Sequence, residues 1–296
     1  MKFLGSLTAL ALASTAYAFP ACSAPGPGSF VVFGDSLSDN GNLWAFTNRS
    51  YPPSPPYFSG RFSNGPTWIE LVAEKHGAAL ADLAWGGATS DSVLSPPAKI
   101  PGFSIPSVKE QVQAFLDNKP LTSVQKTIDA ALDVVKGGIS KAFFVVWGGG
   151  NDYLQEQATG RHVDPSAVAA ALRASLDLLA NRGGKRFIVP NLPGATFADH
   201  NIALNATVTS FRQANPKATV LYFDVNPVFS SVETNPAFKN TTAPCLENIT
   251  KNGQVVGFRV CSEPDTYSEW DGVHPTAAVH RLVAQAAEEL IAKGGK

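Results

Sequence analysis

The sequence predicts an α/β fold, a three-layer αβα sandwich around a flavodoxin-like, five-stranded parallel sheet of order 2-1-3-4-5. Three observations lead to this expectation. Short β-rich runs alternate with segments of helical periodicity, Gly or Pro separates many of them, and the run Ala142 to Trp147 is apolar throughout, as a strand covered on both faces requires. Strands that alternate with helices pair in parallel through crossover connections.

The first half of the chain supplies three of the strands. Ser29 to Phe33 is β-rich and ends at Gly34, and the alanine-rich run Ala78 to Trp85 is the weakest strand candidate. The expected helices here run from Pro66 to His76, where Gly77 ends the pattern, from Val108 to Leu116, and from Ser123 to Val135, which is followed by Gly137-Gly138. Ala142 to Trp147 is the third strand.

The second half continues the alternation. Asp164 followed by Pro165 is typical of a helix start, and that helix extends to about Asn181, before Gly183-Gly184. The remaining elements are a strand from Arg186 to Val189, a helix from His200 to Ala214, a strand from Ala218 to Phe223 and a last helix from Thr276 to Lys293. In the last helix the apolar residues form one stripe: Val279, Leu282, Val283, Ala286, Leu290 and Ile291.

Composition excludes several functional classes. Hydrophobic residues make up 44% of the 296 residues, which is enough for a sizeable core and disfavours disorder. The 23 basic and 24 acidic residues nearly cancel, so the chain lacks the charge that nucleic acids or anionic membranes attract. No phosphate-binding loop and no His/Cys cluster with metal-ligand spacing occurs, so we expect neither cofactor nor metal, and we expect a monomer.

The first eighteen residues resemble a secretory signal peptide. Lys2 supplies a positive charge, Leu4 to Ala13 is a short apolar run, and Ala16-Tyr17-Ala18 is a small-x-small cleavage site. We therefore expect cleavage after Ala18 and a secreted, extracellular domain that spans residues 19–296, without a transmembrane segment.

Glycosylation sequons and cysteines agree with export. Four N-x-[ST] sequons begin at Asn48, Asn205, Asn240 and Asn248. Cys245 and Cys261 bracket a predicted hairpin whose turn is Asn252-Gly253, and folding its arms together brings the two cysteines close. The spacing predicts a Cys245–Cys261 disulfide that stabilises the fold by roughly 3 kcal/mol. For Cys22 the spacing leaves both a free and a bonded state open.

Polar and Gly-rich segments follow three of the strands, where parallel sheets place their binding sites: Gly34 to Leu37, Gly86 to Thr89 and Gly148 to Asp152. Ser36 directly follows the first strand. In the segment Asp271 to Pro275, an Asp three residues before His274 can orient the imidazole to accept a proton from a serine. By itself, this spacing is more typical of a helix-capping Asp and a surface His.

Four blocks in order carry a resemblance to a known family. FGDSLSDNGN (33–42), LAWGGATS (83–90), GGND (149–152) and DGVHP (271–275) resemble the signature blocks of the GDSL, or SGNH, hydrolases, and GRFSNGPTW (60–68) is similar to a stretch of their secreted lipase-like branch, which includes thermolabile haemolysins and acylhydrolases. The resemblance implies that Ser36 is the nucleophile, His274 the base and Asp271 its orienting residue. It also implies an oxyanion hole formed by Ser36, Gly87 and Asn151.

The resemblance implies a secreted serine esterase that hydrolyses lipid or short-chain acyl esters through an acyl-enzyme. The alternatives are a carbohydrate acetyl esterase that acts on plant polysaccharide and a catalytically silent binding protein on the same scaffold. A lipase needs a wide apolar groove, for which the aromatic loop 44–62 offers Trp44, Phe46, Tyr57 and Phe58, whereas the bulky Trp85 favours a tight pocket. The loop fits a substrate wall and a packed surface segment equally well.

Overall fold

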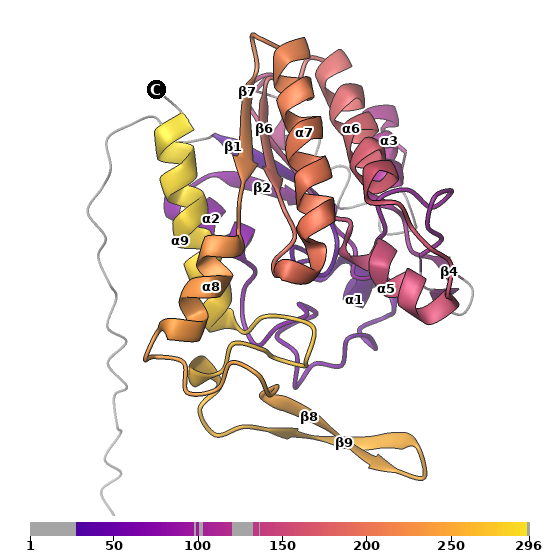
Figure 1. Cartoon of the computed structure of the whole chain (residues 1–296), viewed down its shortest axis with the longest axis vertical. Helices are drawn as coiled ribbons and strands as arrows, with labels where there is room; N and C mark the ends of the chain where they lie inside the picture. Colours follow the sequence, from indigo (N-terminus) through magenta and orange to yellow (C-terminus); the bar gives the residue numbers. More distant parts are fainter. Residues whose placement is uncertain (1–27, 98, 101–102, 120–132, 136, 295–296) are drawn as a thin grey trace, which may run out of the picture.

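The sheet at the centre of the molecule has five parallel strands in the order β2-β1-β5-β6-β7. Figure 1 shows this sheet with helices packed around it. The structure is a computed structural model that describes residues 28–97, 99–100, 103–119, 133–135 and 137–294. The strands are β1 (Ser29–Gly34), β2 (Ala79–Asp82), β5 (Phe143–Trp147), β6 (Arg186–Pro190) and β7 (Thr219–Phe223). Numbered within this sheet alone, they follow the predicted order 2-1-3-4-5, and the predicted αβα class is confirmed.

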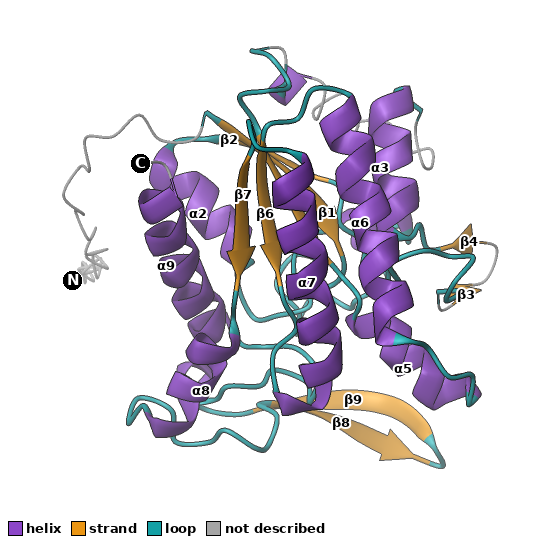
Figure 2. Ribbon diagram, turned by 45° about the horizontal axis from the view of Figure 1, so that its top comes forward, coloured by secondary structure: helices purple, strands orange, loops and turns teal. Residues whose placement is uncertain are grey.

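Helices cover both faces of the sheet, as Figure 2 shows. One layer contains α3 (Val108–Asp117), α6 (Pro165–Asn181) and α7 (Ala198–Ala214), and the other contains α2 (Trp68–His76), α8 (Asn226–Thr234) and α9 (Ala277–Gly294). Successive β1 residues alternate between the layers. Val31 and Phe33 join the core under the first layer, whereas Phe30 and Val32 join the core under the second.

Local capping chemistry sets the helix starts. The Asp164 carboxylate accepts a hydrogen bond from the Ser166 amide at 2.9 Å, and Pro165 occupies the first turn of α6, as the sequence predicts. At the start of α3, the Ser107 hydroxyl and the Glu110 carboxylate pair reciprocally with each other's backbone amides, at 3.3 and 2.8 Å.

Some elements were not predicted. They are three short helices, α1 (Asn42–Phe46), α5 (Gly150–Thr159) and α8, two short strands, β3 (Lys99–Ile100) and β4 (Phe103–Ser104), and the 3-10 turns η1 (Ala195–Phe197) and η2 (Pro264–Thr266). The helix predicted at 123–135 lies mostly outside the described residues, with 133–134 helical. The predicted signal peptide, 1–18, and Cys22 also lie outside them. No helix in the described part is long and apolar enough to cross a bilayer.

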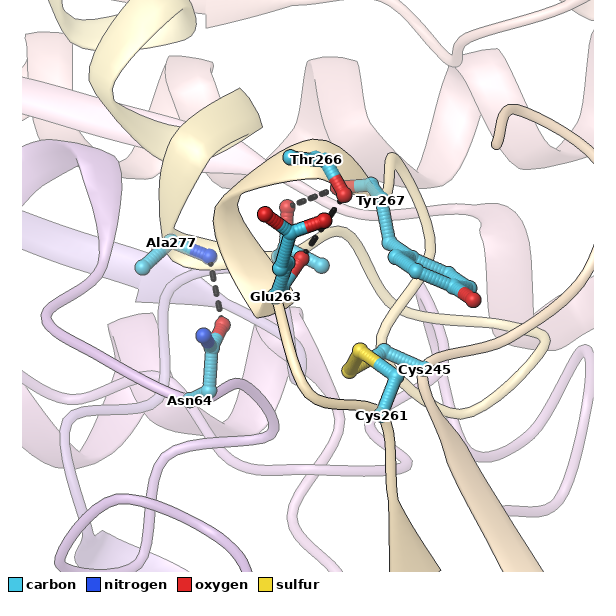
Figure 3. Close-up of a disulfide and its surroundings, with 8 residues drawn as sticks. Asn64, Cys245, Cys261, Glu263, Thr266, Tyr267 and Ala277 are labelled. Carbon is cyan, nitrogen blue, oxygen red and sulfur yellow. Dashed lines mark hydrogen bonds between the residues drawn. A yellow bond between two sulfur atoms is a disulfide. The ribbon is translucent and has the colours of Figure 1, made fainter. Parts of the chain in front are cut away.

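The predicted hairpin is present as β8 (Leu246–Lys251) and β9 (Gln254–Val260) and extends from the end of the sheet where the strands have their carboxyl ends. Asn252 and Gly253 form its turn with φ of 52° and 76°, the left-handed backbone that Asn-Gly turns adopt. A disulfide joins Cys245 and Cys261 at the hairpin base, beside Tyr267 (Figure 3). The Cys245 and Leu246 amides donate to the Glu269 and Trp270 carbonyls, at 3.0 and 2.6 Å, and tie the hairpin base to the segment that leads to Asp271.

Candidate active site

Four segments that are far apart in sequence meet at the carboxyl ends of the central strands. Ser36 follows β1, Gly87 follows β2, and Asn151 lies in the first turn of α5, directly after β5. The loop between η2 and α9 carries Asp271 and His274 to the same place, and Ser36, Gly87, Asn151 and His274 all line one cleft. The structure thus brings together the residues that the four sequence blocks indicate.

Ser36, His274 and Asp271 form a continuous hydrogen-bonded chain. The Nε2 atom of His274 lies 2.8 Å from the Ser36 hydroxyl oxygen. On the other side of the ring, Nδ1 lies 2.8 Å from Oδ2 and 3.0 Å from Oδ1 of Asp271. Because a carboxylate can only accept, Nδ1 carries the proton, which leaves Nε2 as the acceptor for the serine hydroxyl.

The Asp271 carboxylate is held in its ionised form. Burial by itself raises its pKa, but the hydrogen bonds from His274, the positive charge of that ring when it is protonated, and the hydrogen bond from Tyr57 outweigh burial, and the pKa falls below the ordinary value of 3.8. Oδ1 also accepts the backbone amides of His274 and Val273, at 2.9 and 3.1 Å. These bonds fix the carboxylate on its own loop.

Two buried aspartates organise the turn around Ser36. Asp35 accepts the Leu37 amide at 3.1 Å, and burial raises the pKa of Asp35 to about 6. Asp39 accepts the amides of Asn42 and Gly86, at 2.6 and 2.8 Å. The Gly86 bond ties the segment after β1 to the segment after β2, so Asp39 sets the distance between Ser36 and the neighbouring Gly-Gly pair.

Hydrogen bonds distinguish the two glycines, Gly86 and Gly87, of the segment after β2. The Gly86 amide is taken by Asp39, whereas within the described part of the chain neither the Gly87 amide nor the Ser36 amide has a protein acceptor. Gly87 has φ of +82°, and a Cβ there would lie 2.9 Å from the Ile105 side chain. Gly87 is therefore the member of the pair with a free donor at the cleft, and its backbone conformation favours glycine.

Asn151 is positioned by two contacts. Its Nδ2 atom donates one hydrogen to the Ala88 carbonyl at 3.0 Å, which leaves the second hydrogen of the amide for another acceptor. The adjacent Asp152 accepts the amide and the hydroxyl of Ser90, at 2.8 and 2.7 Å. Asp152 thus holds the first turn of α5 against the segment that carries Gly87.

The cleft beside these residues has a volume of about 940 Å³ and is mostly apolar. Its walls come from two separate apolar clusters. One contributes Leu43, Phe62, Ile100 and Ile105, and the other contributes Leu37, Leu192, Phe197, Phe229, Val232 and Val279. In the described residues, no group of three or more His, Cys, Asp or Glu side chains is arranged to hold a metal ion.

The predicted apolar groove of Trp44, Phe46, Tyr57 and Phe58 is wrong, because none of these four side chains lines the cleft. Phe46 packs against Trp85 and Phe103, with ring centroids 5.8 and 3.8 Å away. Trp85 itself is buried in that cluster and does not narrow the cleft. The aromatic loop instead contributes Tyr51 and Phe62 to the cleft wall. The spacing of aromatic residues in the sequence does not distinguish side chains that line a cleft from side chains that pack in a core.

Sequence reasoning also missed the wall that follows the fourth strand of the sheet. Leu192, Pro193 and Gly194 come directly after β6 and line the cleft, as do Phe229 and Val232 of α8. The position of Leu192 could have been inferred, since the same strand-end rule that singled out Ser36 applies to β6. The α8 residues carry no comparable signal in the sequence.

Comparison with known proteins places the chain in a family. The GDSL-like lipase/acylhydrolase family matches residues 30–287. A phosphatidylcholine-sterol acyltransferase of Aeromonas hydrophila is 34% identical over 91% of both chains. A GDSL esterase/lipase of Arabidopsis thaliana is 26% identical over 86% of this chain and 85% of its own.

The thermolabile hemolysin of Vibrio parahaemolyticus is 25% identical over 86% of this chain, but the match spans only 62% of the hemolysin. The family match covers nearly all of the described residues and includes every residue of the site. The chain belongs to the GDSL-like lipase/acylhydrolase family, and it is a carboxylic ester hydrolase.

Proposed function

We propose that Ser36 is the nucleophile of this hydrolase and that the reaction passes through an acyl-enzyme. The Nε2 atom of His274 takes the hydroxyl proton while the Ser36 oxygen bonds to the ester carbonyl carbon. The observation that supports this proposal is the unbroken chain from Ser36 through His274 to Asp271. In it, every donor faces an acceptor at 2.8 to 3.0 Å.

The negative charge that forms on the carbonyl oxygen needs donors. We assign this role to the Ser36 and Gly87 amides and the second Nδ2 hydrogen of Asn151, all at the cleft. The imidazolium then returns its proton to the leaving alcohol, whose bond to the carbonyl carbon breaks. Water repeats the sequence on the acyl-enzyme and releases the carboxylic acid, which regenerates Ser36.

For the substrate we propose a lipid ester with an acyl chain of eight or more carbons. The cleft of about 940 Å³ lies near the upper end of small-molecule pockets, which hold roughly 300–1,000 Å³, whereas an acetyl group needs only a small recess. Its two apolar walls provide the surface that a hydrocarbon chain needs. Each buried methylene contributes up to about 0.8 kcal/mol, or roughly fourfold in kcat/KM.

A series of p-nitrophenyl esters from acetate to palmitate tests this proposal, with Ser36→Ala as the control for background hydrolysis. The proposal predicts a kcat/KM maximum at eight carbons or longer and no turnover by the alanine variant. A maximum at acetate contradicts the lipid assignment and favours a carbohydrate acetyl esterase. Absence of turnover at every chain length favours a silent binding protein.

We also propose that the protein is a secreted, monomeric glycoprotein whose mature chain begins at Phe19. The asparagines of three sequons, Asn48, Asn205 and Asn248, are exposed, whereas Asn240 is half-buried and its side-chain oxygen accepts two backbone amides. Mass spectrometry of the secreted protein, before and after enzymatic deglycosylation, should find Phe19 at the N-terminus and glycans at the exposed asparagines. An N-terminus at Met1 would contradict the proposal.

A further inference from the structure

The aromatic loop 44–62 also contacts the proposed catalytic residues through Tyr57, for which the sequence suggested only a place in the groove wall. The Tyr57 hydroxyl donates a hydrogen bond of 2.7 Å to Oδ2 of Asp271. We infer that Tyr57 is a positioning residue that fixes the Asp271 carboxylate, and through it the His274 ring, for the ester hydrolysis proposed above. The inference rests on that proposed function and extends it to a residue outside the four sequence blocks.

The hydrogen bonds of the carboxylate show what Tyr57 adds. Oδ1 is held by the backbone amides of Val273 and His274, which belong to the same loop as the carboxylate. Oδ2 lies 2.8 Å from Nδ1 of His274. Among the described residues, the second donor to Oδ2 is the Tyr57 hydroxyl. Tyr57 therefore ties the atom that orients the imidazole to an independent part of the fold.

Tyr57 is itself held in place. Its ring packs nearly perpendicular to those of Phe62 and Trp270, with centroids 6.2 and 6.3 Å away. Phe62 lies 5.0 Å from the His274 ring, and Trp270 directly precedes Asp271. The Tyr57 amide donates to the Pro53 carbonyl at 3.1 Å. A hydroxyl on a ring fixed in this way has little freedom to leave the carboxylate.

The charges favour the same arrangement. Burial, followed by the negative charge of Asp271, raises the pKa of Tyr57 above its ordinary value of 10, so the hydroxyl keeps its proton and remains a donor. Burial opposes ionisation of Asp271, and the Tyr57 bond is one of the contacts that offset this effect. The hydroxyl thus helps to keep the carboxylate charged and turned towards Nδ1.

Tyr57 does not line the cleft, so its effect should appear in kcat rather than KM. The variant Tyr57→Phe keeps the packed ring and removes only the hydroxyl. We expect kcat to fall about tenfold, the effect of losing one hydrogen bond to a charged group, while KM for a p-nitrophenyl ester stays within about twofold. Tyr222→Phe is the control, because the Tyr222 hydroxyl donates to the Asn201 backbone carbonyl, and Tyr222 itself neither lines the cleft nor bonds to Asp271 or His274.

The pH profile separates a positioning role from a merely structural one. Loss of the hydroxyl changes the position and the hydrogen bonding of the Asp271 charge beside the imidazole, so the acid limb of kcat/KM should shift in Tyr57→Phe and stay in place in Tyr222→Phe. The other titratable groups that act on this pair, Tyr51 and Glu269 on Asp271 and Asp35 and His280 on His274, are unchanged in both variants.

An NMR measurement keeps the inference testable without turnover. The low-field proton between Nδ1 of His274 and Asp271 should shift in Tyr57→Phe but not in Tyr222→Phe. If the wild-type protein hydrolyses no ester, the proposed function fails, and this shift still decides the inference. Unchanged kcat, acid limb and proton shift in Tyr57→Phe would overturn the inference alone, as would a fall in kcat matched by an equal fall in Tyr222→Phe.

Discussion

Replacing Asn151 by alanine isolates one proposed oxyanion donor. The side chain contributes two N–H groups, one bound to the Ala88 carbonyl at 3.0 Å and one free at the cleft. Loss of the first costs about 1 kcal/mol of stability, a small part of the roughly 5–15 kcal/mol of a typical domain, so the variant should fold. Loss of the second should lower kcat by about 10²–10³, or roughly 3–4 kcal/mol of transition-state stabilisation.

The matched control is Asn215→Ala. Asn215 ends α7 and donates the same kind of bond, from Nδ2 to the Phe211 carbonyl at 2.9 Å, outside the cleft. Its loss should lower stability by a similar amount and leave kcat unchanged. Steady-state kinetics on p-nitrophenyl butyrate, together with thermal unfolding of both variants, measures the two effects separately. If kcat of Asn151→Ala stays within threefold of that of Asn215→Ala, the side chain is not an oxyanion donor.

Two further predictions concern stability. Replacing Cys245 and Cys261 by alanine should lower the free energy of unfolding in urea by about 3 kcal/mol, because the sequence separation of 16 residues sets the loop entropy that the disulfide removes; an unchanged transition midpoint would contradict this. Burial raises the pKa of Asp82 well above 3.8, and among the residues that the structure describes its Oδ2 has no hydrogen-bond partner, so this carboxyl destabilises the native protein as pH rises above 3.8. Asp82→Asn has no carboxyl to ionise at this position, so its free energy of unfolding relative to wild type should increase between pH 4 and pH 8 in chemical unfolding. A difference in unfolding free energy that does not depend on pH would refute this assignment.

Elements with a strong local sequence pattern were predictable from the sequence. The run Ala142 to Trp147 is apolar because β5 is the middle strand of the sheet and is covered by both helical layers. The helix from Pro165 to Asn181 has a capping Asp and a Pro at its start, and its observed bounds are those predicted. In both cases a local requirement, burial on both faces or capping of a helix start, determines the types of neighbouring residues in the sequence.

The helices α1 and α5 show no such pattern in the sequence. The helix α1 spans only Asn42–Phe46, and its position depends on Asp39, which accepts the amides at its start. The helix α5 begins at Gly150, in a Gly-rich segment whose composition is typical of a loop. Tertiary contacts, such as the bond between Asp152 and Ser90, decide its place. Neither helix has a side-chain cap at its start, so the sequence lacks the signal that marked α6.

The candidate site was predictable where its members follow strands or share a loop. The strand-end position of Ser36 and the spacing of Asp271 and His274 made them candidates, and the family resemblance assigned their roles. The contact between Tyr57 and Asp271 spans 214 positions in sequence and depends on how the aromatic loop folds. No local pattern separates that tyrosine from its aromatic neighbours, so only the structure reveals which ring reaches the carboxylate.

The proposed mechanism requires Ser36 to be a reactive nucleophile beside His274. Labelling with a fluorophosphonate, followed by peptide mapping, tests this most directly, because the reagent bonds covalently to an activated serine hydroxyl. We expect one modified residue, Ser36, with labelling abolished in Ser36→Ala and strongly slowed in His274→Ala. Stoichiometric labelling of another serine, or labelling that persists in Ser36→Ala, would contradict it.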